Sequence, residues 1–496
     1  MPFFRPLAVA LVVLSSAVFA AAPTAITDAA TSVTATTAQL NGRGNPNAEA
    51  TLGWFRYATT NPVTCDDVFG TRVPAAGGTS LGSGTAVTAY SVSTSGLLPG
   101  TTYYVCAITN NNSGTAVGSV SQFTTPAQAP AVTTLAATVV TSFGATLNGS
   151  AIPRGSSSTG YFRYSNVNPG SCTNSFGTVV PMTPTALGSG NSSVSYSEPL
   201  VGLQAGVTYY YCAIAQNGVG TGLGTLLQFT TLVAVPTVVT NVPSSVGGTS
   251  ATLSGTVNPN GASTSGWFRI ASSNPGSCND AFGTRVPSSG GNALGGGSSN
   301  VSHTWSATLS PGTTYYYCAI AQNSEGTTLG NVVSFTTPDI PTVTTNAQTN
   351  LLPTTLTLNG SAVTNLAAAT AWFRISPTNP GVCNDGFGTR WPSSGGTSLN
   401  AGTPPQAFSQ NVSGLLPGTT YFACAIAQNS VGTGYGSLIT INTPPAVPIV
   451  STNAVSANTT GTSVTFNGTA DPRGDATTGY FRYATTNPST CNDTFG

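Results

Sequence analysis

The chain has 496 residues and a formal net charge of zero, and only 5% of its residues are charged. All twelve basic residues are arginines scattered along the chain, so it lacks the clustered positive charge that nucleic acid or anionic lipid requires. A hydrophobic content of 39% is too high for a disordered chain. Because the chain is too long to fold around a single hydrophobic core, we expect several folded domains of about 100–150 residues.

Residues 1–20 have the pattern of a secretory signal peptide. Arg5 precedes an apolar run that begins at Leu7, and small residues follow up to Ala20. The run is too short to span a bilayer, and no second long apolar run follows it. We therefore expect a secreted or cell-surface protein with no membrane span in its mature chain.

The rest of the chain repeats itself with a period of about 106 residues. Each unit contains a "GYFRY" or "GWFRI" segment, a Cys-containing loop that ends near "FGTRVP", and an "LLPGTTYY" segment that carries a second Cys. Short alternating segments between Gly, Pro, Asn and Ser, without a helical period, predict an all-β fold with one β-sandwich per unit. The predicted repeats 1 to 5 are 22–128, 129–233, 234–338, 339–445 and 446–496, the last being only the first half of a unit.

Eight of the nine cysteines form couples about 40 residues apart, one in each of the first four repeats. In an exported protein, such couples predict one disulfide per repeat. The couples are Cys65 with Cys106, Cys172 with Cys212, Cys278 with Cys318, and Cys383 with Cys424. A metal site is disfavoured, because the chain has no C-x-x-C and a single histidine. Cys491 is left over, and we expect its partner about 40 residues further on, in a longer protein of which this sequence is a fragment.

The order "L-x-P-G-T-T-Y", an alternating strand, "N-S-x-G-T" and "F-T-T-P" resembles the fibronectin type III family, in the form common in bacterial exported proteins. The resemblance covers the whole mature chain and implies a tandem array of immunoglobulin-like β-sandwiches, each with a tyrosine corner. Two features depart from the family: the cysteine pair, and the absence of its usual Trp on the second strand. Leucines stand in that place, at Leu147, Leu253 and Leu358.

The resemblance makes Tyr315 the corner tyrosine of repeat 3, with its hydroxyl bonded to backbone upstream. Alternation along the strand then directs Tyr317 into the sandwich and Cys318 outward, and Trp267 on the neighbouring strand also points outward. This outer face is apolar, so it is either covered or a binding site. We expect the loop 271–287, held by the disulfide, to cover it.

Two details of this cover concern charged and aromatic side chains. We expect Phe282 to lie against the outward aromatic residues, and Arg269 to pair with Asp280 in the loop. Repeat 2 has Val179 at the position of Arg285, which predicts that the arginine is dispensable there. If the loop leaves them open, Trp54, Trp267 and Trp372 form an aromatic binding surface that could stack on sugar rings.

Two further motifs have less to support them. Arg473, Gly474 and Asp475 form the tripeptide that integrin-binding proteins display, although turn chemistry alone explains these residues. The lone His303 has no nucleophile or base placed by a motif, so we expect no catalytic residues in this segment and no cofactor.

Two functions remain open for such repeats. The first is a structural or adhesive protein that acts as a semi-rigid stalk or interaction array, meeting an extracellular protein or glycan. The alternative is an accessory array of an extracellular enzyme whose catalytic domain lies beyond residue 496. A fold of this kind serves either purpose.

Overall fold

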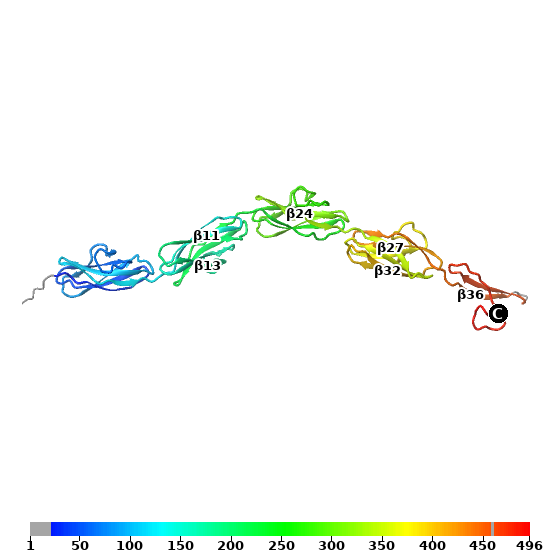
Figure 1. Ribbon diagram of the computed structural model, residues 1–496, viewed down its shortest axis with the longest axis horizontal. Coiled ribbons are helices and arrows are strands. Elements are labelled where there is room, and N and C mark those ends of the chain that lie inside the picture. The colour runs from blue at the N-terminus through cyan, green and yellow to red at the C-terminus, as the bar shows by residue number, and fades with distance from the viewer. Residues whose placement is uncertain (1–20, 458–460) are drawn as a thin grey trace, which may run out of the picture. The chain divides into compact units, whose positions relative to one another are not determined.

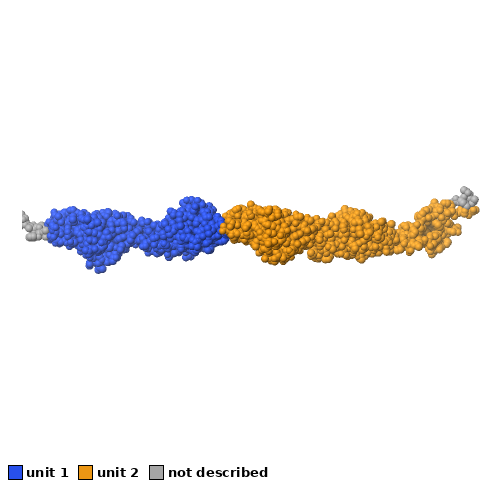
Figure 2. All heavy atoms as spheres, turned by 90° about the horizontal axis from the view of Figure 1, so that it is seen from above, with its two compact units in different colours: residues 1–234 blue, residues 235–496 orange. Residues whose placement is uncertain are grey.

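The structure, a computed structural model, describes residues 21–457 and 461–496 (Figure 1). The predicted signal peptide lies outside these residues. Every regular element in the described part is a β-strand, and no helix there is long and apolar enough to cross a membrane. The chain forms two compact units, residues 1–234 and 235–496, coloured separately in Figure 2. The bounds of the individual repeats stay predictions, and the repeats are named by them below.

Unit 1 contains repeats 1 and 2, each built from two antiparallel sheets. A three-stranded sheet has the order β1-β2-β6 in repeat 1 and β10-β11-β14 in repeat 2, and a larger sheet is centred on β3-β7 or β12-β15. The strands of repeat 1 are β1 (Ile26–Thr31), β2 (Thr37–Gly44), β3 (Thr51–Ala58), β4 (Thr71–Val73), β5 (Thr79–Gly82), β6 (Thr88–Ser95), β7 (Thr102–Asn111), β8 (Gly114–Val117) and β9 (Ser121–Thr124). Those of repeat 2 are β10 (Ala131–Thr138), β11 (Gly144–Ile152), β12 (Ser158–Ser165), β13 (Thr178–Gly188), β14 (Val194–Val201), β15 (Thr208–Asn217), β16 (Thr221–Leu223) and β17 (Leu227–Thr230).

Unit 2 repeats this plan twice, with three-stranded sheets β18-β19-β23 and β27-β28-β32, and adds a two-stranded sheet, β36-β37. The strands of repeat 3 are β18 (Thr237–Thr240), β19 (Ser250–Asn258), β20 (Thr264–Ala271), β21 (Thr284–Val286), β22 (Asn292–Gly295), β23 (Val301–Thr308), β24 (Thr314–Asn323), β25 (Gly326–Leu329) and β26 (Val333–Thr336). Those of repeat 4 are β27 (Thr342–Thr349), β28 (Thr355–Val363), β29 (Ala369–Ser376), β30 (Thr389–Trp391), β31 (Thr397–Leu399), β32 (Gln406–Ser413), β33 (Thr420–Gln428), β34 (Thr433–Tyr435) and β35 (Ile439–Asn442). The last two are β36 (Ile449–Ala457) and β37 (Val464–Asp471).

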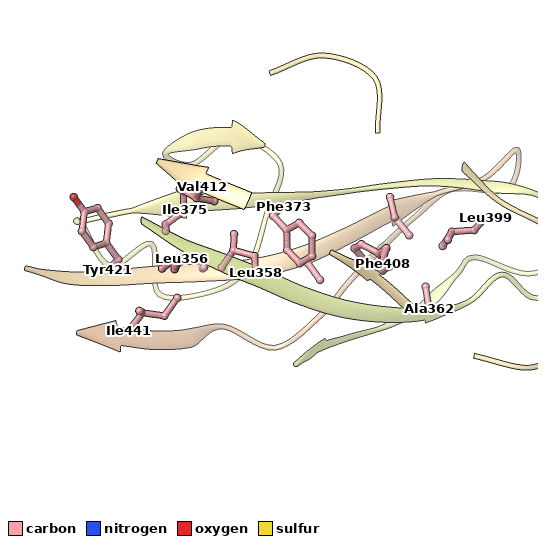
Figure 3. Packing of buried hydrophobic residues seen from close by; sticks show 14 of the residues in the cluster. Leu356, Leu358, Ala362, Phe373, Ile375, Leu399, Phe408, Val412, Tyr421 and Ile441 are labelled. Carbon is pink, nitrogen blue, oxygen red and sulfur yellow. The ribbon is translucent and has the colours of Figure 1, made fainter. Parts of the chain in front are cut away.

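Each sandwich buries the alternate side chains that face the space between its sheets. In repeat 4, Leu358 from the three-stranded sheet packs with Phe373 and Phe408 (Figure 3). The leucines that stand where the fibronectin type III family has Trp are fully buried. Truncating such a leucine to alanine removes core contacts worth about 2–5 kcal/mol. The all-β sandwich prediction is confirmed.

A glycine on the second strand of each sandwich, in "LNG" or, in repeat 3, "LSG", lets the two sheets approach closely. A Cβ on Gly149 would lie 2.6 Å from the Cβ of Ala213 on β15, which is closer than such atoms come. Gly255 meets Ala319 in the same way, at 2.8 Å. The recurring Gly and the Ala after each second Cys are therefore one packing pair.

The tyrosine corner is present in each of repeats 1 to 4. The hydroxyl of Tyr315 accepts a hydrogen bond from the backbone N–H of Ser310 at 3.0 Å, five residues upstream. Tyr103, Tyr209 and Tyr421 accept the equivalent bonds at 2.8, 3.0 and 2.9 Å. This bond fixes the chain where it enters the strand that carries the second cysteine.

Candidate functional site

The outer face of each larger sheet is covered by the cysteine-containing loop. Cys278 is bonded to Cys318, and their Cα atoms are 6.0 Å apart. The other three couples are also joined, Cys65 to Cys106, Cys172 to Cys212, and Cys383 to Cys424. One disulfide per repeat is therefore confirmed. Cys491 is exposed and not disulfide-bonded.

Beneath the loop lies a second, smaller hydrophobic cluster, separate from the sandwich core. In repeat 3 it consists of Trp267, Cys318 and Ile320, with Cys278 and Phe282 packed against them. Strand parity produces it, because Trp267 lies opposite Ile320 in the β20–β24 pairing while Phe268 and Ala319 face the main core. The expected cover, with Phe282 against the aromatic residue, is confirmed. Repeats 2 and 4 have the same cluster.

Besides the disulfide, the carboxylate of Asp280 links the loop to the sheet. Asp280 Oδ1 accepts a hydrogen bond from Trp267 Nε1 at 2.8 Å and another from Arg269 Nε at 2.9 Å. Burial raises the pKa of Asp280, but the hydrogen bonds from Trp267 and Arg269 and the charge of the arginine outweigh it, so the net pKa is lowered. The predicted pairing of Arg269 with Asp280 is confirmed, and Arg56 with Asp67 and Arg374 with Asp385 repeat it.

Arg285 is also part of this arrangement. Its position is valine in repeat 2, but in repeat 3 the arginine makes specific contacts that the prediction of a dispensable position did not include. Its guanidinium lies over the Trp267 ring, 4.5 Å from the ring centroid. It also donates to the backbone oxygen of Pro287 at 2.8 Å and to that of Gly290. Arg285 thus occupies the outer face of the indole and fastens the turn after β21.

Repeat 2 shows why Val179 is tolerated there. In that repeat, Tyr161 replaces the tryptophan and Asn174 replaces the aspartate, and the tyrosine hydroxyl donates to Asn174 Oδ1 at 2.8 Å. In repeat 2 all three residues differ from those of repeats 1, 3 and 4, whereas Tyr480 of repeat 5 keeps a carboxylate partner, Asp493. A tyrosine at this position is therefore compatible with either an amide or a carboxylate in the loop. Alignment of the repeats at these three positions shows the difference in repeat 2 from the sequence alone.

The structure corrects the interpretation of Trp54, Trp267 and Trp372 as an aromatic binding surface. Their exposed fractions are 7%, 5% and 5%. In each case an arginine lies over the ring, 4.4 to 4.5 Å from its centroid. These indoles are structural parts of the loop and are not open to a sugar ring.

The Arg473, Gly474 and Asp475 tripeptide forms the turn after β37. The backbone oxygen of Arg473 accepts a hydrogen bond from Ala446 N at 3.0 Å, and a Cβ on Gly474 would lie 2.5 Å from the Cα of Gly418 in repeat 4. In unit 1, Gly155 packs in the same way against Gly100, and no aspartate follows it. The close contact between successive repeats therefore accounts for Gly474 at this turn, and the role of the tripeptide in adhesion stays a prediction.

His303 is a buried residue of the repeat 3 core. It is 1% exposed, its ring stacks on Phe268 at 4.3 Å, and its Nδ1 lies 3.2 Å from Asn292 Nδ2. Burial lowers the pKa of His303 to about 4, although the nearby Trp267 backbone favours the proton slightly. Within residues 21–457 and 461–496, no group of three His, Cys, Asp or Glu side chains could hold a metal ion.

Comparison with known proteins gives little beyond this geometry. No protein-family model matches the sequence, and no curated protein matches it. Among solved structures, the chicken CNTN1 FN1–FN3 domains match at 15% sequence identity with a TM-score of 0.27. That match covers 64% of this chain and 99% of the other. From its own strand order and corner tyrosines, the described chain is a tandem array of fibronectin type III-like β-sandwiches.

Proposed function

We propose that the chain is a secreted or cell-surface structural and adhesive repeat protein. In this proposal, the repeats act as a semi-rigid stalk or interaction array, without catalytic activity in this segment. The observation that carries the proposal is that the polar and aromatic side chains around the cysteine loop make their contacts within their own repeat. In repeats 1, 3 and 4, the Trp, Asp and two Arg side chains at the cysteine loop and the strands beside it all contact one another or the backbone of their own repeat.

Contacts between successive repeats inside each unit add support. In unit 1, Asn191 Nδ2 of repeat 2 donates to the backbone oxygen of Pro99 in repeat 1 at 2.9 Å. The close approach of Gly100 and Gly155 lies beside it, and Gly418 and Gly474 repeat that approach in unit 2. Such contacts restrict bending at these two junctions, as a semi-rigid spacer requires.

The disulfides suit a chain that works under tension. In repeat 3, the disulfide spans a sequence separation of 40 residues, so only about 65 of the roughly 105 residues can extend when the repeat unfolds. At about 3.5 Å per residue, the extended length of the unfolded repeat is about 230 Å with the disulfide and about 370 Å without it.

Single-molecule force spectroscopy on the full chain tests this proposal. We expect four steps under oxidising conditions, each near the shorter length after subtraction of the folded length, and longer steps after reduction. A chain that extends smoothly without discrete steps, or whose steps ignore the reductant, would contradict the structural role. The accessory-array alternative receives no support from Trp54, Trp267 and Trp372, since these residues are covered.

A further inference from the structure

Repeat 3 has an open cleft on one side of its sandwich, and the two ends of the disulfide loop form part of its lining through Ser272, Ser273 and Thr284. It lies where the edge strands of its two sheets, β21 and β23, leave the core accessible. Its volume is about 650 Å³, and Ile270, Val286, Trp305 and Tyr315 supply its apolar walls. Sites that bind small molecules commonly have volumes of about 300–1,000 Å³.

Two side chains line this cleft where repeats 1 and 2 have others: Ile270, whose position is also isoleucine in repeat 4 (Ile375), and Trp305, whose indole has no counterpart in repeats 1, 2 and 4. The position of Ile270 holds Tyr57 in repeat 1 and Tyr164 in repeat 2, and these rings pack against the corner tyrosines with centroids 5.9 and 6.2 Å apart. With isoleucine at this position, repeat 3 has no such ring. In repeat 2, the corresponding pocket is about 280 Å³.

The second of these side chains places an indole at the cleft. Trp305 lies on β23 at the position that holds Val92, Glu198 and Gln410 in repeats 1, 2 and 4. It is partly buried against the sandwich core and also lines the cleft. Unlike Trp267, it has no arginine over its ring among the cation contacts of the described residues.

The remaining lining is uncharged and rich in hydroxyl groups. It includes Ser272, Ser273, Thr284, Ser306 and Thr308. In the part of the chain that the structure describes, none of these five side chains makes a hydrogen bond within the protein. No Asp, Glu, Arg or His lines the cleft, so it has no group that would pair with an ionic ligand. An apolar ring surrounded by free hydroxyls matches a ligand with an apolar face and a polar rim.

We propose that this cleft binds a neutral saccharide, with the C–H face of a sugar ring on the Trp305 indole and the serine and threonine hydroxyls bonded to the sugar hydroxyls. The site deepens the proposed function, on which it rests, because it gives the interaction array a glycan partner at one defined repeat. It also differs from the covered surface at Trp267, since it uses a different tryptophan on the other sheet.

Isothermal titration of the full chain with cellohexaose, maltohexaose and chitohexaose tests this site. We expect at least one of these neutral oligosaccharides to bind, and Trp305→Ala to weaken that binding at least about tenfold. Ile270→Tyr is the second variant, because repeats 1 and 2 show that the sandwich accommodates this ring. It fills the cleft and should abolish binding in a folded protein. The matched control is Gln410→Ala at the equivalent position of repeat 4, which should leave binding unchanged.

Three results would overturn the proposal. They are absence of binding by all three oligosaccharides at about 10 mM, unchanged binding by both the Trp305 and the Ile270 variants, and tighter binding of an oligogalacturonate than of any neutral sugar. A chain that fails this titration but still shows the disulfide-dependent extension steps would lose the glycan site alone. The structural role would stand.

Discussion

Removing the Cys278–Cys318 disulfide should sharply destabilise repeat 3 while leaving its contacts in place. The double variant Cys278→Ala and Cys318→Ala removes the cross-link, and alanine keeps the buried position of Cys318 apolar. The loop that the bond closes has a sequence separation of 40 residues. In the chain-entropy account, opening a loop of this length in the unfolded state costs the folded repeat about 4 kcal/mol of stability.

Contacts in the second cluster should keep the folded loop in place without the cross-link. Trp267 and Arg269 still donate to Asp280, and Phe282 still packs on the indole. The decrease in the free energy of unfolding therefore comes mainly from the greater freedom of the unfolded chain. If repeat 3 has the stability of an ordinary domain, a free energy of unfolding of several kcal/mol should remain. The variant should thus be folded and easier to open.

Hydrogen-exchange mass spectrometry of the full oxidised chain measures this effect repeat by repeat. Slowly exchanging amides of β24 should lose between about two and three powers of ten in protection, since each 1.4 kcal/mol is a factor of about ten. The amides of β15 in repeat 2, whose Cys172–Cys212 bond is untouched, provide the internal control. A loss of less than about tenfold in β24 would refute the idea that the disulfide stabilises the repeat through the unfolded chain.

Three further variants test single contacts in repeat 3. Arg285→Val should lower the free energy of unfolding by about 1 kcal/mol, from the lost stacking and hydrogen bonds. The same change in a Trp267→Tyr background should cost less, and additive effects in denaturant titrations would contradict the coupling inferred from repeat 2. Tyr315→Phe should cost about 1 kcal/mol, because Ser310 N–H loses its acceptor, and an unchanged denaturation midpoint would argue against the corner bond. His303 has a pKa lowered from 6.5 to about 4, so as the pH falls the unfolded chain binds a proton at this histidine before the folded chain does. Stability of repeat 3 should thus be full above pH 6.5 and fall as the pH drops toward 4, and a His303→Tyr variant whose melting temperature falls equally over that range would exclude the histidine as the cause.

Much of the architecture could be predicted from local sequence patterns. Alternation predicted the strands and which side chains of the cysteine strand face the core, because a strand directs successive residues to opposite faces. Regular spacing predicted one disulfide per repeat, and the corner motif predicted the bond at Tyr315. These features depend on residues that are close in sequence or repeat at a constant interval.

The state of the tryptophans was decided only by the tertiary structure. Whether Trp267 is exposed depends on Asp280, 13 residues later, and on Arg285 beyond it, which reach the indole only after the loop folds back over the sheet. The cleft in repeat 3 likewise needs Ile270 and Trp305, which belong to different sheets. Strand parity assigns each of these residues to a face, but distances across a loop or between two sheets depend on how distant segments pack. By itself, the sequence therefore determined which faces exist, and packing determined which of them are closed and which stay open.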